Sequence, residues 1–153
     1  MIGVADPGHA EIVLAGGMLT CPASTGPVRP CGHAWARTVR DHGTAVVALR
    51  PRRARCRTCR GTQVLLPAVV APRRADTTAV IGAALQASAR GTGYRRIATQ
   101  LQRPLSTVRR WIRAVRDPGH VEWLRTQGMV WLARVDLDVI NTLGRRPPGW
   151  VTP

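Results

Sequence analysis

The clearest periodicity of apolar positions in the chain is helical and falls between residues 76 and 116. Three short helices are predicted there. The first runs over 77–89, with Asp76 as its N-terminal cap, and ends at Arg90-Gly91-Thr92-Gly93. Its apolar positions form one stripe along the helix: Val80, Ile81, Ala84 and Leu85.

A short second helix is expected over 94–101. Ile97 and Leu101 lie four residues apart and face the core. Ala98 is small enough to let a neighbouring helix approach closely. The chain then turns at Gln102-Arg103, so the second helix is joined to the third by a tight turn.

The third helix is expected to run from Leu105 to about Val115. Pro104 suits its first position, because a missing N–H costs nothing there. One side of this helix is apolar: Val108, Trp111 and Ile112. The opposite side is polar: Ser106, Arg109, Arg110 and Arg113. The arrangement predicts a helix-turn-helix, which lays its last helix in the major groove of DNA.

Candidate DNA contacts follow from this geometry. Arginine presents a planar fork of donors that fits the guanine edge, so the base contacts are expected from arginines of the third helix. These candidates are Arg109, Arg110 and Arg113, with Ser106 as a shorter reader of a base or a phosphate. The start of the second helix is placed for the phosphate backbone. The candidates there are Tyr94, Arg95 and Arg96. For each arginine, a solvated surface position is the alternative.

The stretches 94–101 and 105–113 resemble the helix-turn-helix of bacterial transposases and invertases of the homeodomain-like superfamily. The pattern of that family runs Ile-Ala-x-x-Leu-Gly, an apolar residue, and then Ser/Thr-Val-x-x-Trp. Two positions depart from it. Gln102 stands where glycine usually makes the turn, and Arg103 stands where an apolar residue usually packs.

Basic residues far outnumber acidic ones. The chain of 153 residues carries 23 basic side chains against 8 acidic ones, a formal net charge of +15, and every basic side chain is arginine. Such a surplus indicates a polyanionic partner, since each arginine set against a phosphate releases condensed counterion. Together with the helix-turn-helix, it predicts double-stranded DNA as the partner.

The part before residue 67 favours strands. A short helix is expected within 7–19, before the break at Gly16-Gly17. Residues 35–40 and the β-branched stretch 44–50 predict a hairpin, with Asp41-His42-Gly43 as its turn.

The cysteines suggest a zinc site. Cys56-Arg57-Thr58-Cys59 is one half of a four-ligand site, and the other half is expected at Cys21-Pro22-Ala23-Ser24. Ser24 occupies the second position of that half, and a neutral hydroxyl is a poor zinc ligand. Cys31 or His33 could supply the missing group if the loop folds back. The ligands are therefore predicted as Cys21, Cys56 and Cys59, with Cys31 ahead of His33 as the fourth. Four closed ligands would make the ion structural; a ribbon that has lost its metal is the alternative.

The cysteine region, together with 50–56 and 62–67, resembles the N-terminal zinc-binding domain of a transposase family. Small bacterial proteins with the order zinc ribbon, Val-Leu-Leu-Pro linker and helix-turn-helix resemble residues 15–116. The implied fold class is α+β: a small zinc-ribbon-like β-hairpin subdomain, then an all-α, three-helix homeodomain-like domain with an extra C-terminal helix. The expected domains are 1–70, 71–118 and 119–153.

A fourth, amphipathic helix is expected over 121–143, and the tail 144–153 shows no periodic pattern. Trp123 and Trp131 on that helix are explained most simply as core. If they formed a homodimer interface instead, they would favour a transcriptional regulator that binds a palindromic site.

An enzyme is not expected. Transposition chemistry usually gathers three carboxylates around two metal ions, and only Asp136 and Asp138 lie close together in this sequence. No apolar run approaches the roughly 18 residues that span a membrane, and the first twenty residues lack the basic leader of a signal peptide. A cytoplasmic protein with reduced cysteines is therefore expected.

The leading hypothesis is sequence-specific binding of duplex DNA by a non-catalytic, transposase-related recognition protein. Two alternatives stay open: a dimeric transcriptional regulator, and a module in which the zinc ribbon binds RNA or another protein.

Overall fold

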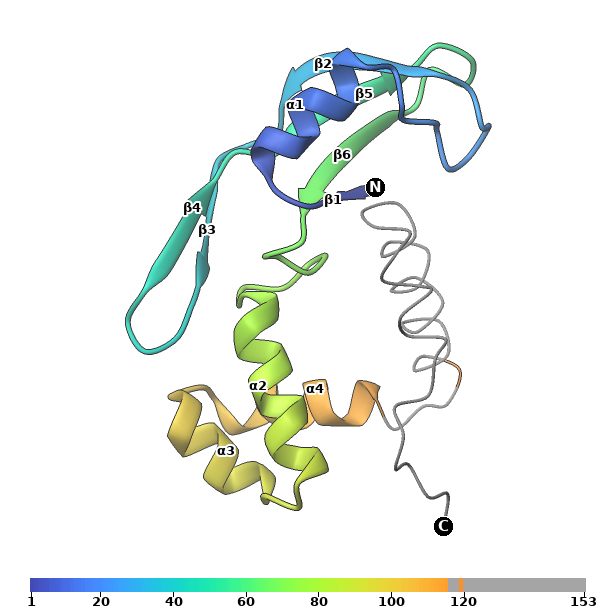
Figure 1. Cartoon of the computed structure of the whole chain (residues 1–153). Coiled ribbons are helices and arrows are strands. Elements are labelled where there is room, and N and C mark those ends of the chain that lie inside the picture. Colours follow the sequence, from blue (N-terminus) through green and yellow to red (C-terminus); the bar gives the residue numbers. More distant parts are fainter. Residues whose placement is uncertain (116–118, 120–153) are drawn as a thin grey trace, which may run out of the picture. The chain divides into compact units, whose positions relative to one another are not determined.

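The computed structural model describes residues 1–115 and 119 (Figure 1). An α+β arrangement is confirmed, with strands before residue 67 and helices after it. Residues Met1–Ile112 form one compact unit. The elements, in chain order, are β1 (Ile2–Val4), α1 (Pro7–Ala15), β2 (Val28–His33), β3 (Arg37–Arg40), β4 (Val46–Leu49), β5 (Arg52–Cys56), β6 (Thr62–Pro67), α2 (Thr78–Ala89), α3 (Tyr94–Leu101) and α4 (Leu105–Ala114).

Four of the strands form one sheet in the order β1-β6-β5-β2. β5 pairs antiparallel with both β2 and β6, while β1 lies parallel to β6. Helix α1 covers one face of this sheet and contacts all four of its strands (Figure 1). The core between helix and sheet includes Val13, Leu14, Val28 and Leu65. The sheet is therefore larger than the hairpin that the sequence predicts.

Strand β6 corrects the prediction of a Val-Leu-Leu-Pro linker. Leu65 is buried in the core under α1, whereas Leu66 packs with Val39 and Val70 in a second small core. Consecutive side chains of a strand point to opposite faces, so β6 is apolar on both. A strand buried on both faces lacks the polar–apolar alternation that marks a strand in a sequence.

The predicted hairpin is confirmed as β3 and β4, which pair antiparallel from Arg37 opposite Leu49 to Arg40 opposite Val46. It begins two residues later than expected, because Trp35 lies before β3 rather than in it. Residues 75–77 pair with the end of β3 that leads into the hairpin turn. The Arg40 N–H donates to the carbonyl of Ala75 at 2.8 Å, and the Thr77 N–H donates to the carbonyl of Arg40 at 2.9 Å. The start of α2 is thereby fixed to the hairpin.

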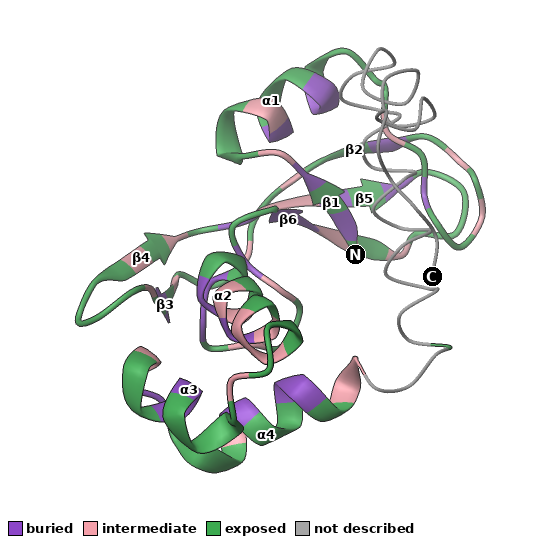
Figure 2. Ribbon diagram, turned by 60° about the horizontal axis from the view of Figure 1, so that its bottom comes forward, coloured by how far each residue is buried: buried purple, intermediate pink, exposed green. Residues whose placement is uncertain are grey.

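Helices α2, α3 and α4 pack around a core of their own, as predicted. Its buried members are Val80, Ala84, Ile97, Ala98, Val108, Trp111 and Ile112. Figure 2 shows buried positions in all three helices, with exposed positions along the outer side of each. Helix α3 has the predicted bounds, and α4 begins at the predicted residue. Pro104 directly precedes α4, and its carbonyl accepts the N–H groups of Thr107 and Val108.

The sequence suggested Asp76 as the N-terminal cap of α2, and this prediction is wrong. The cap is Thr77, whose hydroxyl oxygen accepts the N–H of Val80 and donates to a carboxylate oxygen of Asp41 at 2.9 Å. Asp76 is 2% exposed. Its Oδ1 accepts Nε of Arg103 at 2.6 Å, and its Oδ2 accepts Nη2 of Arg40 at 2.8 Å. Both carboxylate oxygens are therefore paired with arginines from other elements.

Arg103 explains the departure from the helix-turn-helix pattern at its position. Its side chain is 4% exposed. Nη1 donates to the carbonyls of Leu101 and Gln102, and Nη2 donates to the carbonyl of Asp41. The guanidinium thus takes the place of the usual apolar residue and has a partner for each of its nitrogens.

The predicted helix 121–143 and the tail 144–153 lie outside the described residues. None of the helices in the described part is long and apolar enough to cross a membrane.

Asp76→Ala should lower the free energy of unfolding by about 3–5 kcal/mol, because it leaves a buried guanidinium without its counter-ion. Urea unfolding followed by circular dichroism measures the change. Arg40→Ala is the matched control: the Arg40 side chain is 46% exposed, so its loss should cost about 1 kcal/mol or less. Equal effects of the two substitutions would show that the Asp76–Arg103 pair is not the dominant contact.

Candidate nucleic-acid interface and metal centre

The exposed side of α4 carries the predicted base contacts. Ser106, Arg109, Arg110 and Arg113 are all exposed. They follow a spacing of three and four residues, which places them in one stripe along the helix. The opposite side of α4 is held by Val108, Trp111 and Ile112, which are 0%, 3% and 8% exposed. Burial of those three fixes which way the polar stripe faces.

Helix α3 brings the predicted backbone contacts beside this stripe. Tyr94, Arg95 and Arg96 are exposed at its first turn. The guanidinium carbon of Arg109 lies 5.4 Å from the centre of the Tyr94 ring, a cation–π distance. Tyr94 therefore restricts the freedom of Arg109, and a backbone candidate and a base candidate form one unit.

The turn between α3 and α4 has the left-handed conformation that glycine usually supplies. Gln102 has φ 51° and ψ 47° and ends α3. Its N–H donates to the carbonyl of Thr99, and the Arg103 N–H donates to the carbonyl of Ala98. The turn predicted at Gln102-Arg103 is thus confirmed, and the absence of glycine does not change its geometry.

Three of the four cysteines come together at one end of the sheet. The sulfur atoms of Cys21, Cys56 and Cys59 all lie within 4.8 Å of one another. Cys21 Sγ and Cys59 Sγ are 3.6 Å apart. A tetrahedral zinc site with Zn–S bonds of about 2.3 Å requires sulfurs about 3.8 Å apart. The donor set and its spacing therefore fit a soft divalent metal ion.

The two loops that carry these cysteines have the same backbone design. The Cys21 N–H donates to the carbonyl of Gly26, five residues on, and the Cys56 N–H donates to that of Gly61, also five residues on. Thr25 and Arg60, each four residues after the first cysteine, have φ 55° and φ 61°. By this correspondence Ser24 stands in the first loop where Cys59 stands in the second.

The loops also touch each other. Gly26 lies so close to the second loop that a Cβ there would overlap the Thr58 hydroxyl. The Arg57 N–H donates to the carbonyl of Pro27 at 3.0 Å. Ser24 Oγ is 3.3 Å from Cys56 Sγ. Ser24 therefore lies directly beside the three-cysteine group.

Cys31 and His33 are not part of this group. Both lie on β2, and neither belongs to the cluster of potential metal ligands among the described residues. The position of Ser24 beside these cysteines does not follow from residue type, because a serine hydroxyl is a poor zinc ligand and Cys31 or His33 is the better donor. The repeated spacing, Cys21-x-x-Ser24-x-Gly26 beside Cys56-x-x-Cys59-x-Gly61, was the available signal.

Hydrogen bonding favours the thiolate form of two of these cysteines. The Ser24 hydroxyl is the main cause that lowers the pKa of Cys56 to about 6, with help from the N–H groups of Cys59 and Thr58 and against the effect of burial. A hydrogen bond from the Ala23 backbone is the largest cause that lowers the pKa of Cys21. Metal binding needs thiolates, so the loops prepare the sulfurs for it.

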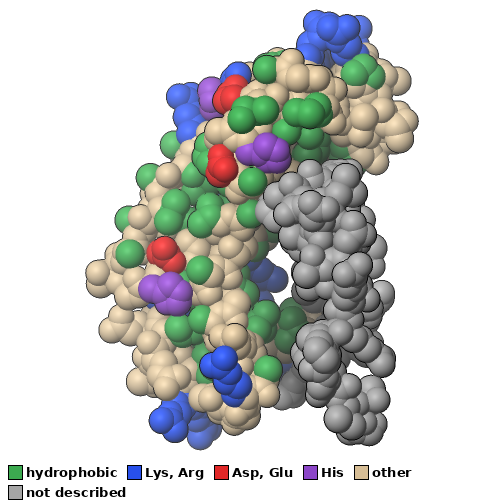
Figure 3. Space-filling model, in the orientation of Figure 1, with side chains coloured by type: hydrophobic (Ala, Val, Ile, Leu, Met, Phe, Trp, Pro, Cys, Tyr) green, Lys and Arg blue, Asp and Glu red, His purple; other side chains and the backbone are tan. Residues whose placement is uncertain are grey.

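Arginines also gather around the second loop. Figure 3 shows arginine side chains at the turn between β5 and β6. A cavity of about 390 Å³ there is lined by Cys56 and by four arginines, namely Arg29, Arg55, Arg57 and Arg60. In the described part of the chain, none of these arginines forms an ion pair with a carboxylate. This surface offers unneutralised charge beside the candidate metal centre.

Comparison with known proteins bears on the helical part. Residues 77–122 match the family model of a homeodomain-like domain. That match spans α2, α3 and α4 and supports DNA binding in general. Searches of curated proteins and of solved structures found no match.

Gln102→Gly should raise the free energy of unfolding by about 0.5–1 kcal/mol, because glycine adopts the left-handed conformation without strain. Gln100→Gly is the matched control on the exposed side of α3 and should lower it by about 1 kcal/mol. Urea unfolding of the two variants should therefore give changes of opposite sign. A loss of stability in both would contradict the observed turn.

Proposed function

We propose that the protein binds double-stranded DNA in a sequence-specific way, with α4 as the recognition helix in the major groove. The observation that carries this proposal is the exposed stripe of Ser106, Arg109, Arg110 and Arg113 on a helix whose other side is buried in the core. Arginine in that groove can donate two hydrogen bonds to guanine. The stacking of Arg109 on Tyr94 directs one of these arginines before DNA arrives.

The first turn of α3 then supplies backbone contacts. Arg95 and Arg96 are exposed there and have no carboxylate partner among the described residues. Contacts with phosphate fix the register of the protein on DNA but do not read its sequence. The net charge of +15 adds long-range attraction to the same partner.

We infer a role in recognition rather than in catalysis, as in the DNA-recognition part of a transposase-like system. All four acids in the described part are engaged in structural contacts. Asp76 pairs with two arginines, and Glu11 pairs with Arg52 at 2.6 Å. Asp41 accepts the Thr77 hydroxyl, and Asp6 caps α1 by accepting the His9 N–H at 2.9 Å. Carboxylates engaged in these separate structural contacts do not form a cluster that could hold catalytic metal ions.

We further propose that Cys21, Cys56 and Cys59 hold a zinc ion, with Ser24 at the fourth corner. Such an ion would join the two loops and stabilise the end of the sheet, because thiolates bind zinc tightly and bring their loops together. A hydroxyl is a weak ligand compared with a thiolate. The site should therefore bind zinc less tightly than a complete four-cysteine site.

The DNA proposal is tested by selection from a random duplex pool at two salt concentrations. The wild-type protein should enrich one motif. Arg109→Ala and Arg110→Ala should relax that motif at single positions, since each bidentate contact is worth about 1–3 kcal/mol of discrimination. Arg95→Ala should weaken all sequences alike and reduce the salt dependence by about one counterion. Binding that depends steeply on salt but enriches no motif would contradict the proposal of sequence-specific binding.

The metal proposal is tested by titrating the reduced protein with cobalt, whose absorption reports thiolate ligands, and then displacing cobalt with zinc. Ser24→Cys should raise the affinity about tenfold or more, because it completes four thiolates. Cys31→Ser is the control and should leave the affinity unchanged, whereas Cys59→Ser should abolish the thiolate absorption. If Cys31→Ser weakened binding as much as Cys59→Ser does, Cys31 would be the fourth ligand and Ser24 would not.

A further inference from the structure

Trp35 is the most unusual side chain in the described part of the chain. It is 94% exposed. Leaving a whole indole in water forgoes the free energy that its burial would provide. Tryptophan is enriched at the interfaces that proteins form with their partners.

The backbone next to Trp35 is hydrogen-bonded to a neighbouring segment. The segment 34–36 connects β2 to β3 and runs beside residues 50–51, which connect β4 to β5. The Ala34 N–H donates to the carbonyl of Pro51 at 2.8 Å, next to Trp35. The pairing of β2 with β5 also shifts register between Pro30 and His33. Irregularities of this kind re-aim side chains and occur often next to binding sites.

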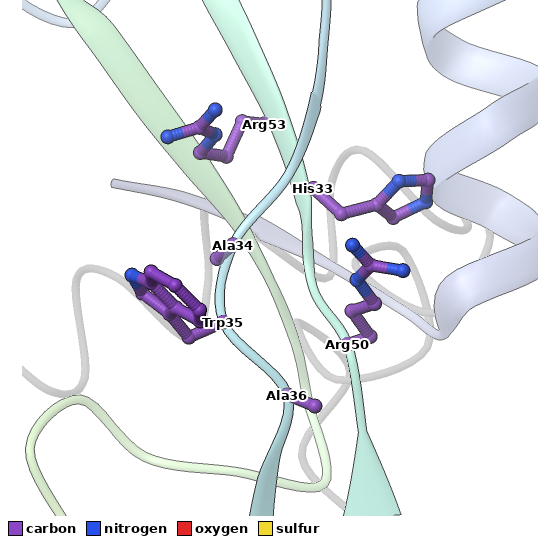
Figure 4. A pocket seen from close by; sticks show the side chains of 6 residues that line it. All are labelled: His33, Ala34, Trp35, Ala36, Arg50 and Arg53. Atoms are coloured by element: carbon purple, nitrogen blue, oxygen red, sulfur yellow. The ribbon is translucent and has the colours of Figure 1, made fainter.

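Basic side chains line the same cavity as the indole. A cavity of about 390 Å³ is lined by His33, Ala34, Trp35, Ala36, Arg50 and Arg53. In Figure 4, Trp35 and Arg53 project to the same side of the connecting segment, while His33 and Arg50 project to the other. The indole of Trp35 and the partly exposed side chain of Arg53 therefore lie on the same side of the segment.

The positive charge of Arg53 is not neutralised within the described part of the chain. The ion pairs there join carboxylates to Arg40, Arg52 and Arg103, and none involves Arg53 or Arg50. Glu11, which lies on α1, pairs with Arg52. The Nε of Arg53 is buried without a hydrogen-bond partner, so the rest of its guanidinium is the part that an external anion can contact. The charge of Arg53 is therefore available to a phosphate group.

We propose that this Trp35 site binds one unpaired nucleotide of a nucleic-acid strand, with its base stacked on Trp35 and its phosphate on Arg53. Guanidinium groups bind phosphate through paired, charge-assisted hydrogen bonds. A base in a duplex has both faces covered by its neighbours, so an exposed indole can stack only on a base that has left the stack. The site lies on the β-sheet part of the chain and goes beyond duplex recognition by α4.

The test compares two fluorescent probes of equal length and charge, an oligo-dT strand and the same strand with abasic positions. Anisotropy titrations use the full-length protein at a fixed, low salt concentration. The wild-type protein should bind the strand with bases about fivefold or more tightly, as expected for stacking of one base. Trp35→Ala should remove this preference, whereas Trp35→Phe should keep most of it. Arg53→Ala should weaken both probes.

Duplex binding separates this inference from the proposed function. Trp35→Ala should bind a selected duplex as the wild type does, and Arg110→Ala should keep the preference for bases in the single strand. Circular dichroism confirms that the Trp35 variants fold. Equal affinity of the wild type for the two single-stranded probes would overturn the inference. The inference would also be overturned if Trp35→Ala kept the preference for the strand with bases over the abasic strand. The same holds if the protein bound an acidic, aromatic peptide at the Trp35 site more tightly than oligo-dT.

Discussion

The buried carboxylate of Asp76 is the contact on which the arrangement of the molecule depends. It receives Arg103 from the turn between α3 and α4 and Arg40 from the end of β3. The sheet part and the helical part otherwise have separate cores. Charges that are buried together need defined geometry, since a displaced partner leaves the other unpaired at high cost. One aspartate therefore fixes the turn before α4 relative to the hairpin.

A second contact between distant parts of the sequence joins two loops at one end of the sheet. Two loops of equal backbone design bring Cys21, Cys56 and Cys59 together, and Ser24 stands where symmetry places a fourth thiol. The Ser24 hydroxyl lies 3.3 Å from the Cys56 sulfur, and this hydrogen bond lowers the pKa of Cys56 and favours its thiolate. Around this group and around Trp35 lie arginines that have no acidic partner within residues 1–115, and they extend the positive charge well beyond α4.

The sequence predicted local features better than distant ones. Helix α3, the start of α4 and the β3–β4 hairpin follow from apolar period and turn residues within ten or so positions. The pairing of Asp76 with Arg103 spans 27 positions and carries no periodic signal. Strand β1 is only three residues long and strand β6 is apolar on both faces, so neither shows the polar–apolar alternation that marks a strand in a sequence. Residue type favours Cys31 over Ser24 as the fourth zinc ligand, whereas the geometry of the loops places Ser24 beside Cys56.

The central claim is that α4 enters the major groove of DNA. Nuclear magnetic resonance of protein with labelled arginine Nε groups, titrated with a selected duplex, tests it most directly. The signals of Arg109, Arg110 and Arg113 should shift and become protected from exchange, because bidentate contacts order the guanidinium groups. Shifts confined to the arginines of β5 and of the turn after it would contradict the claim and place duplex binding on the sheet.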